Sequence, residues 1–236
     1  MAQFSGWSDG GAMQARVQRL IERQRDHRDG ASESQTDVAR ARVVSEEPFS
    51  DALVSLIGTA GAQDSIDVAA LYLSQRELVR ALLDAARRGA TIRVLLDPNK
   101  DGYGFDRSGL PNRVVASELV ADSDGAVRVR WYRTHGEQFS PGFILLREVQ
   151  HSWLVVGTAA LSRRDLNDFN LAAGIITELP LQATASREAL TWFDTLWFNR
   201  ASGGIEYSSD ADVYADASQI RYWQYRLMEA GGTGFE

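Results

Sequence analysis

A short segment after a predicted strand, residues 134–146, holds the side chains in this chain best suited to chemistry. His135 and Glu137 flank a glycine, and Ser140 follows three residues later. A histidine beside a carboxylate can transfer protons near neutral pH, whereas a serine hydroxyl becomes a nucleophile only when a base takes its proton. A loop histidine that hydrogen-bonds the backbone, where the strand 127–133 ends, also fits this pattern. We favour that structural interpretation of His135.

Three short motifs between residues 140 and 172 carry a family resemblance. They read Ser140-Pro141-Gly142 before an apolar run and Arg147, then Gly157-Thr158-Ala159-Ala160, then Asn170-Leu171-Ala172. Their order and spacing resemble the active-site region of the phospholipase D superfamily. Members of that family carry His-x-Lys-x-x-x-x-Asp on a strand, then a Gly-Ser-x-Asn turn, then Asn-x-Glu.

The resemblance implies that each of five active-site groups has been replaced. Ser140 stands at the histidine, Gly142 at the lysine, Arg147 at the aspartate, Ala160 at the asparagine of the turn and Ala172 at the glutamate. The family cleaves phosphodiesters through a covalent phosphohistidine, with lysine and asparagine stabilising charge on the phosphoryl oxygens. We therefore predict no catalytic residues, and expect phosphodiester hydrolysis and transphosphatidylation to be lost.

A residual pocket is a second expectation of the same resemblance. Its candidate residues are His135, Glu137, Asn170, Arg163 and Arg164. Two alternatives to a plain pseudoenzyme follow. One is a divergent hydrolase of phosphodiesters or other esters that uses His135 with Glu137, and the other is a non-catalytic binder of phosphate or phospholipid headgroups. We also expect the pocket to accept Ser140→His together with Gly142→Lys without regaining much activity.

The composition limits the classes of site that the chain can build. It has 236 residues, 44% of them hydrophobic, no cysteine and three scattered histidines. A thiolate metal site or disulfide is therefore excluded, and we predict neither a metal nor a cofactor. The net charge of −7 argues against sequence-independent nucleic-acid binding, which needs cations to neutralise phosphates. Arg128 and Arg130, on one face of a predicted strand, fit a solvated surface.

The sequence also carries expectations about location. No run approaches the roughly 18 apolar residues that a membrane span needs. The first eleven residues lack the charged-then-apolar order of a secretion signal. We therefore expect an intracellular soluble protein, in the cytoplasm or an organelle interior, while peripheral association with a membrane complex stays open.

The pattern of apolar residues predicts two regions. Residues 12–25 carry an apolar stripe at helical spacing and residues 26–37 are polar, so residues 1–42 are predicted as a helical arm with a linker. Residues 43–236 are predicted as one degenerate phospholipase D-like domain. Its fold class is α/β, a single repeat with a mixed, mostly parallel sheet of six or seven strands flanked by helices.

Individual elements follow from local signals. Near-continuous apolar runs at 65–73 and 91–96 predict strands buried on both faces, with a helix between them. Ser74 to Glu77 reads as a capping box at the start of that helix, and Gly89 as its end. Further strands are predicted at 127–133, 143–150, 153–158 and 171–177, and helices at 49–58, 114–120, 181–199 and 218–230.

The resemblance covers residues 43–235 and matches one repeat of a family in which two repeats pair. A lone repeat leaves an apolar surface exposed, so we expect it to bind a partner chain. A heteromeric assembly is favoured, and a homodimer is the alternative. Trp192, Trp197, Trp223 and Tyr225 are candidates for that interface. The function expected from the sequence is that of a structural or regulatory subunit of a larger protein assembly.

Overall fold

A computed structural model describes residues 39–231 apart from 46, 103–104, 168–169, 171 and 201–202. The predicted N-terminal helix at 12–25 lies outside the described residues. Within the part of the chain that is described, no helix is long and apolar enough to cross a membrane.

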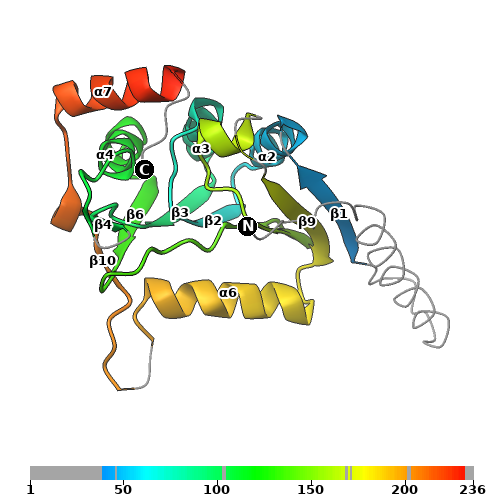
Figure 1. Ribbon diagram of the computed structural model, residues 1–236. Coiled ribbons are helices and arrows are strands. Elements are labelled where there is room, and N and C mark those ends of the chain that lie inside the picture. The colour runs from blue at the N-terminus through cyan, green and yellow to red at the C-terminus, as the bar shows by residue number, and fades with distance from the viewer. Residues whose placement is uncertain are drawn as a thin grey trace, which may run out of the picture. The chain divides into compact units, whose positions relative to one another are not determined.

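An eight-stranded mixed sheet forms the centre of the described unit (Figure 1). Its order is β1-β9-β8-β7-β2-β3-β6-β10. The strands are β1 Arg40–Ser45, β2 Ser65–Ala70, β3 Thr91–Leu96, β6 Val127–Tyr132, β7 Phe143–Arg147, β8 His151–Gly157, β9 Ala173–Pro180 and β10 Ser208–Asp210. A separate two-stranded sheet, β4 Asp101–Gly102 with β5 Phe105–Asp106, lies in the glycine-rich loop after β3.

The predicted mixed sheet with flanking helices is confirmed, but the expectation that it is mostly parallel is wrong. Only β2–β3 and β3–β6 are parallel, and the other five neighbouring pairs are antiparallel. Helical crossovers connect strands only as far as β6. After that point a short turn links β7 to β8, and β9 returns beside β8, which reverses the strand direction each time.

The two edge strands of the sheet, β1 and β10, are not revealed by the sequence pattern. β1 begins at Arg40, so three residues assigned to the linker belong to the domain. Its sequence alternates arginine with small and apolar residues. Because most of β1 is exposed at the edge of the sheet, it lacks the continuous apolar run of a central strand. β10 consists of three residues, all polar, so it also gives no apolar signal in the sequence.

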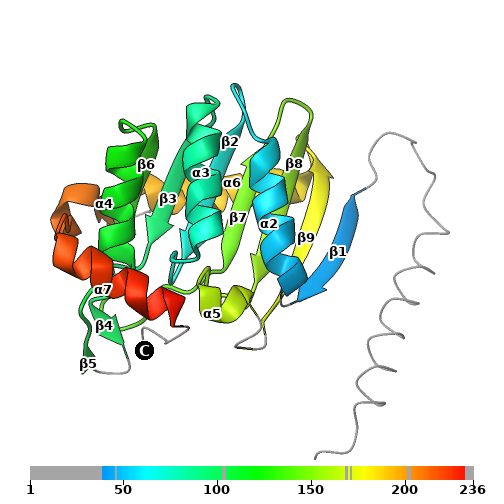
Figure 2. The ribbon, with the colours of Figure 1, turned by 90° about the horizontal axis from the view of Figure 1, so that it is seen from above.

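Helices cover the two faces unequally (Figures 1 and 2). One face carries α2 Glu47–Thr59, α3 Arg76–Arg87 and α4 Asn112–Asp122, and α7 Gln219–Ala230 packs on α4. The other face carries α6 Thr184–Trp197. Two short elements, α5 Arg163–Leu166 and the 3₁₀ turn η1 Ala211–Tyr214, complete the set of described helices.

The start of α3 differs from the predicted capping box. Gln75 is the N-cap, and its side-chain oxygen accepts a hydrogen bond from the backbone N–H of Leu78. The Ser74 hydroxyl instead donates to Glu229 on α7, 155 residues away, so a long-range contact has replaced the local cap. The end of the helix follows the prediction, since Gly89 has a φ of +97°.

Each face of the sheet has its own core. The larger core lies under α2, α3 and α4, and the smaller one lies between the sheet and α6, around Ala69, Leu95, Phe143, Leu145 and Phe193. Two of the four predicted interface aromatics, Trp197 and Tyr225, are buried in these cores. Trp192 and Trp223 are exposed.

A buried ionic cluster lies in the smaller core. Asp67 on β2 and Arg93 on β3 are partners in the parallel register, and they form a two-pronged contact with distances of 2.6 Å (Nε–Oδ1) and 2.8 Å (Nη2–Oδ2). Arg93 also donates to Asp194 on α6 at 2.8 Å, and its guanidinium lies over the ring of Phe193. This cluster therefore ties the sheet to α6.

We expect Asp67→Asn to lower the free energy of unfolding by about 3 kcal/mol, because it removes the fully buried one of the two carboxylates that neutralise Arg93. Urea denaturation followed by circular dichroism measures the change. The matched control is Asp84→Asn, which breaks an exposed ion pair with Arg87 on α3 and should cost less than about 1 kcal/mol. Equal effects of the two substitutions would contradict a structural role for the buried pair.

Candidate functional site

The degenerate motifs converge at one edge of the sheet, the one formed by the ends of β2 and β8 and the starts of β7 and β9. β7 runs antiparallel to β2, so the start of β7 lies beside the end of β2. The end of β8 and the start of β9 lie at the same edge, because Gly157 pairs with Gly174 and Phe143 pairs with Val156. Ser140, Gly142, Ala160 and Ala172 are therefore brought to one edge, as the family resemblance implies. Arg147 is not, because it ends β7 at the opposite edge.

The backbone at Gly142 leaves no room for a side chain. Gly142 has a φ of +50°, and a Cβ built there would lie 2.1 Å from the carbonyl oxygen of Gly157. The two residues are also hydrogen-bonded, with the Gly157 N–H donating to the Gly142 carbonyl at 3.0 Å. This contact argues against the expectation that the position accepts a lysine, because the Gly157 carbonyl oxygen occupies the space that the Cβ needs.

A carboxylate that the sequence analysis passed over organises the former glycine turn. Asp165 accepts hydrogen bonds from the backbone N–H of Ala160 at 2.8 Å and from the amide of Asn170 at 2.6 Å. Arg164 donates its Nε to the Asn170 oxygen at 3.2 Å. Asn170 and Arg164 are thus brought together and engaged with each other. The signal for Asp165 was its position, five residues after the lost asparagine and five before Asn170.

Arg163 faces away from this group. Its guanidinium donates to the carbonyl oxygens of Glu229 and Ala230 at 3.1 and 2.7 Å, where α7 ends. The carboxylate of Glu229 accepts from the Arg163 backbone N–H and from Ser74. Burial raises the pKa of Glu229, and these hydrogen bonds oppose the rise only in part. Arg163 therefore helps to hold α7 and does not join a pocket with Arg164.

His135 and Glu137 lie together on an exposed loop after β6. Their side chains are 77% and 52% exposed, and the His135 Nδ1 is 3.8 Å from the Glu137 Oε1. The backbone N–H groups of Glu137 and His135 donate to the carboxylate and lower its pKa, which makes it a weaker base. No third group orients the histidine within the described interactions of this loop.

Arg147 has become part of the buried ionic cluster. Its Nη2 is 3.8 Å from the Asp67 carboxylate, and its buried Nε has no hydrogen-bond partner. A phosphate at the opposite edge of the sheet is out of its reach, because β7 separates the two edges by five residues. Arg147, Arg163 and Arg164 therefore do not converge on one site.

An apolar groove adjoins the degenerate motif. It has a volume of about 400 Å³ and lies between β7, β8 and α6, with walls made by Pro141, Phe143, Leu154, Val156, Ala185, Glu188, Ala189 and Trp192. Its single charged residue is a carboxylate. An anion such as a phosphate would meet no cation there, so the groove suits an apolar group.

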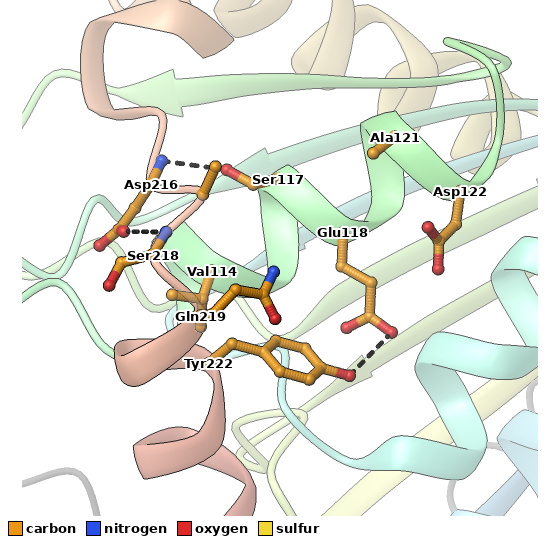
Figure 3. A pocket seen from close by; sticks show the side chains of 10 residues that line it. Val114, Ser117, Glu118, Ala121, Asp122, Asp216, Ser218, Gln219 and Tyr222 are labelled. Atoms are coloured by element: carbon orange, nitrogen blue, oxygen red, sulfur yellow. Dashed lines mark hydrogen bonds between the residues drawn. The ribbon is translucent and has the colours of Figure 1, made fainter.

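A second, polar cleft lies between α4 and the start of α7 and was not predicted (Figure 3). It has a volume of about 230 Å³ and is lined by Glu118, Asp122 and Asp216, among others. The carboxylate of Glu118 is held by two hydrogen bonds from Arg76, at 2.6 and 2.7 Å. Asp216 accepts from Ser218 and donates its backbone N–H to Ser117. Glu118 and Asp216 are therefore engaged in contacts that hold α4 to α3 and to the start of α7.

Two further features concern possible metal ligands and the arginines on and after β6. In the described ranges, no three histidine or carboxylate side chains lie close enough to hold a metal ion. The strand arginines meet carboxylates: Arg130 pairs with Asp210, and Arg133 pairs with Glu206 at 2.8 Å. Carboxylates therefore offset their charge.

Comparisons with known proteins agree with this geometry. The family model described as the phospholipase D-like domain of cardiolipin synthase matches residues 53–197. A comparison with curated protein sequences finds no match.

Three solved structures share the fold. The phospholipase D family member Nuc from Salmonella typhimurium has a TM-score of 0.51 at 16% identity, over 73% of this chain and all of that one. NucT from Helicobacter pylori has a TM-score of 0.53 at 13% identity, over 68% and 97%. Phosphatidylserine synthase from Haemophilus influenzae has a TM-score of 0.56 at 9% identity, over 90% of this chain and 52% of the synthase. At these identities the likeness concerns the fold alone.

The closed backbone at Gly142 can be tested with a single methyl group. We expect Gly142→Ala to lower the free energy of unfolding by about 3 kcal/mol, since the clash with Gly157 adds to the cost of a positive φ. The matched control is Gly125→Ala, where φ is +78° but nothing lies within 4 Å of the added Cβ. That control should cost about 1 kcal/mol. Urea denaturation measures both, and a Gly142→Ala protein as stable as the control would show that space for a lysine remains.

The buried carboxyl of Glu229 should make stability depend on pH. A raised folded-state pKa means that the stabilising contribution is present below the ordinary value of 4.5 and is lost as pH rises through the raised value. We therefore expect Glu229→Gln to become more stable relative to the wild type as pH rises from 4 to 8. Urea midpoints at several pH values measure the difference. A difference that stays constant, or that moves in the opposite direction, would contradict the raised pKa.

Proposed function

The chain belongs to the phospholipase D superfamily, and within it we propose that this protein is catalytically inactive and serves as a structural or regulatory subunit of a larger protein assembly. The observation that carries the proposal is the contact between Gly142 and the Gly157 carbonyl, which occupies the place where a catalytic lysine side chain would begin. The replacement of the histidine by Ser140 and of the asparagine by Ala160 supports the same conclusion, since a serine needs a base to become a nucleophile and an alanine side chain offers no hydrogen-bond donor.

The two alternative functions gain no support from the geometry. A hydrolase that used His135 would rely on an exposed pair whose carboxylate has a lowered pKa. A binder of phosphate or lipid headgroups would need converging cations. Arg163 is committed to the end of α7, and Arg147 lies at the other edge of the sheet.

A role in an assembly is supported by the uncovered part of the sheet. α6 covers only part of its face, and an apolar row continues beyond it across four neighbouring strands. In the strand register Phe143 lies opposite Val156, Val156 opposite Ile175 and Ile175 opposite Val43. The last three of these side chains are exposed, as is the adjacent Trp192. An apolar surface of this kind beside the former active site is typical of a protein–protein contact.

We favour a different protein as the partner at this edge, because twofold pairing of two copies here would assemble no catalytic groups. The site then persists as a scaffold: Asp165 holds the turn at Ala160 and the side chain of Asn170, while the reactive side chains are absent. Such a subunit would act through its shape and would need no cofactor.

We expect purified protein to hydrolyse bis(p-nitrophenyl) phosphate no faster than buffer, and His135→Ala to leave that background unchanged. We also expect the endogenous protein, detected with an antibody after gel filtration of native extract, to elute well above its own mass of 26.1 kDa. Turnover that disappears in His135→Ala would overturn the claim of inactivity. Elution as a free 26.1 kDa chain would overturn the claim of assembly.

A further inference from the structure

The C-terminal helix α7 is firmly attached to the domain along one side. Tyr225 is fully buried, and its hydroxyl donates to the Ser74 carbonyl at 2.7 Å. Glu229 is buried against Ser74, and Arg163 binds the carbonyls at the end of the helix. The helix is therefore a fixed platform, and the direction in which its outer side faces is set by these contacts.

The outer side of α7 carries no charge. Its exposed residues are Gln219, Ile220, Trp223, Gln224, Leu227 and Ala230. Three of them are large and apolar, with exposed fractions of 83% for Ile220, 61% for Trp223 and 73% for Leu227. These three residues, spaced three and four apart, form one stripe along the helix, called the α7 stripe below.

The helix α3 shows what a solvent-facing helix of this protein looks like. Its exposed positions are Glu77, Arg80, Asp84 and Arg87, all of them charged. A helix that is apolar on two sides is normally buried between layers. The α7 stripe also lies outside residues 53–197, which the family model matches.

We propose that the α7 stripe pairs with the α7 stripe of a second copy of this chain, in an antiparallel twofold contact. The inference rests on the proposed function, which requires an assembly, and assigns one of its surfaces. The stripe is nearly symmetric about Trp223 and Gln224. A twofold axis there places Ile220 against Leu227 of the partner subunit, and Trp223 beside the partner's Trp223.

The charges around the stripe allow this pairing. Arg221 is half-buried and bound to Asp216 at 3.0 Å, and Arg226 is half-buried with its guanidinium near the Tyr222 ring. Neither arginine belongs to the exposed arc, so no like charges meet across the axis. An anionic membrane is a poorer occupant. Glu118, Asp122 and Asp216 line the cleft beside α7, and the chain carries a net charge of −7.

The absence of cysteine from the sequence gives a direct test. In the full chain carrying Gln224→Cys, the introduced thiol lies near the twofold axis, so mild oxidation should give a disulfide-linked dimer. Thr191→Cys, at an exposed position on α6, is the matched control and should cross-link at least about tenfold more slowly, because only random collisions join it.

Sedimentation equilibrium gives an independent measurement. Two short helices bury a small interface, so we expect a dimer with a dissociation constant on the order of 10 µM. Leu227→Glu should weaken it at least about tenfold, since each copy would bury a charge against Ile220. Val149→Glu, at an exposed apolar position between β7 and β8, should leave it unchanged. Circular dichroism confirms that each variant is folded.

Each of these measurements can overturn the proposed pairing of the α7 stripes. A wild-type monomer at about 200 µM, a dimer that survives Leu227→Glu, or equal cross-linking of the two cysteine variants would overturn the pairing. So would a monomer that floats with phosphatidylcholine–phosphatidylglycerol vesicles only when the stripe is intact, or that binds a different chain through it. None of these outcomes bears on catalysis, which turnover measures separately, so failure here and failure of the proposed function are distinguishable.

Discussion

The ionic contact between Asp67 and Arg93 determines how the layers of this protein meet. Both residues lie on central strands and face α6, and both are buried, so that an unpaired charge on either one is costly. Arg93 must also reach Asp194, which fixes α6 over the centre of the sheet. α6 also contacts β8 and β9, where Ser186 is hydrogen-bonded to Ser152. The exposed side chains of Val156, Ile175 and Val43 therefore lie on the part of this face that the helix leaves open.

Much of the central fold could be predicted from the sequence, because its signals are local. The apolar runs of β2 and β3, and Gly89 at the end of α3, each reflect a constraint acting within a few residues. The edge strands were missed because β1 lacks a continuous apolar run and β10 has only three residues, all of them polar. The strand directions were misjudged even though the predicted strands at 143–150 and 153–158 are too close in sequence for a crossover helix, which by itself implies an antiparallel pair. Ser74 was misread because its partner Glu229 is distant in sequence.

The candidate site likewise has some features that the sequence predicts and others that depend on the three-dimensional arrangement. The absence of the family's histidine, asparagine and glutamate at Ser140, Ala160 and Ala172 can be predicted from the sequence, since it depends only on the residue types. The closure at Gly142 cannot, because it depends on where a neighbouring strand places one carbonyl oxygen. The positions of Arg147 and Arg163 likewise depended on the three-dimensional arrangement. Arg147 joined a buried charge cluster, and Arg163 bound the end of a helix.

The contact between Gly142 and Gly157 has an evolutionary consequence. A lineage that loses one catalytic side chain can regain it by a single reversion while the backbone still holds the vacant space. In this chain a Cβ at Gly142 would lie 2.1 Å from the Gly157 carbonyl oxygen, and its φ is positive, so the first step toward a lysine is itself destabilising. If the protein is inactive as proposed, a single substitution at Gly142 is then not enough to regain a lysine there, because the neighbouring backbone must change with it.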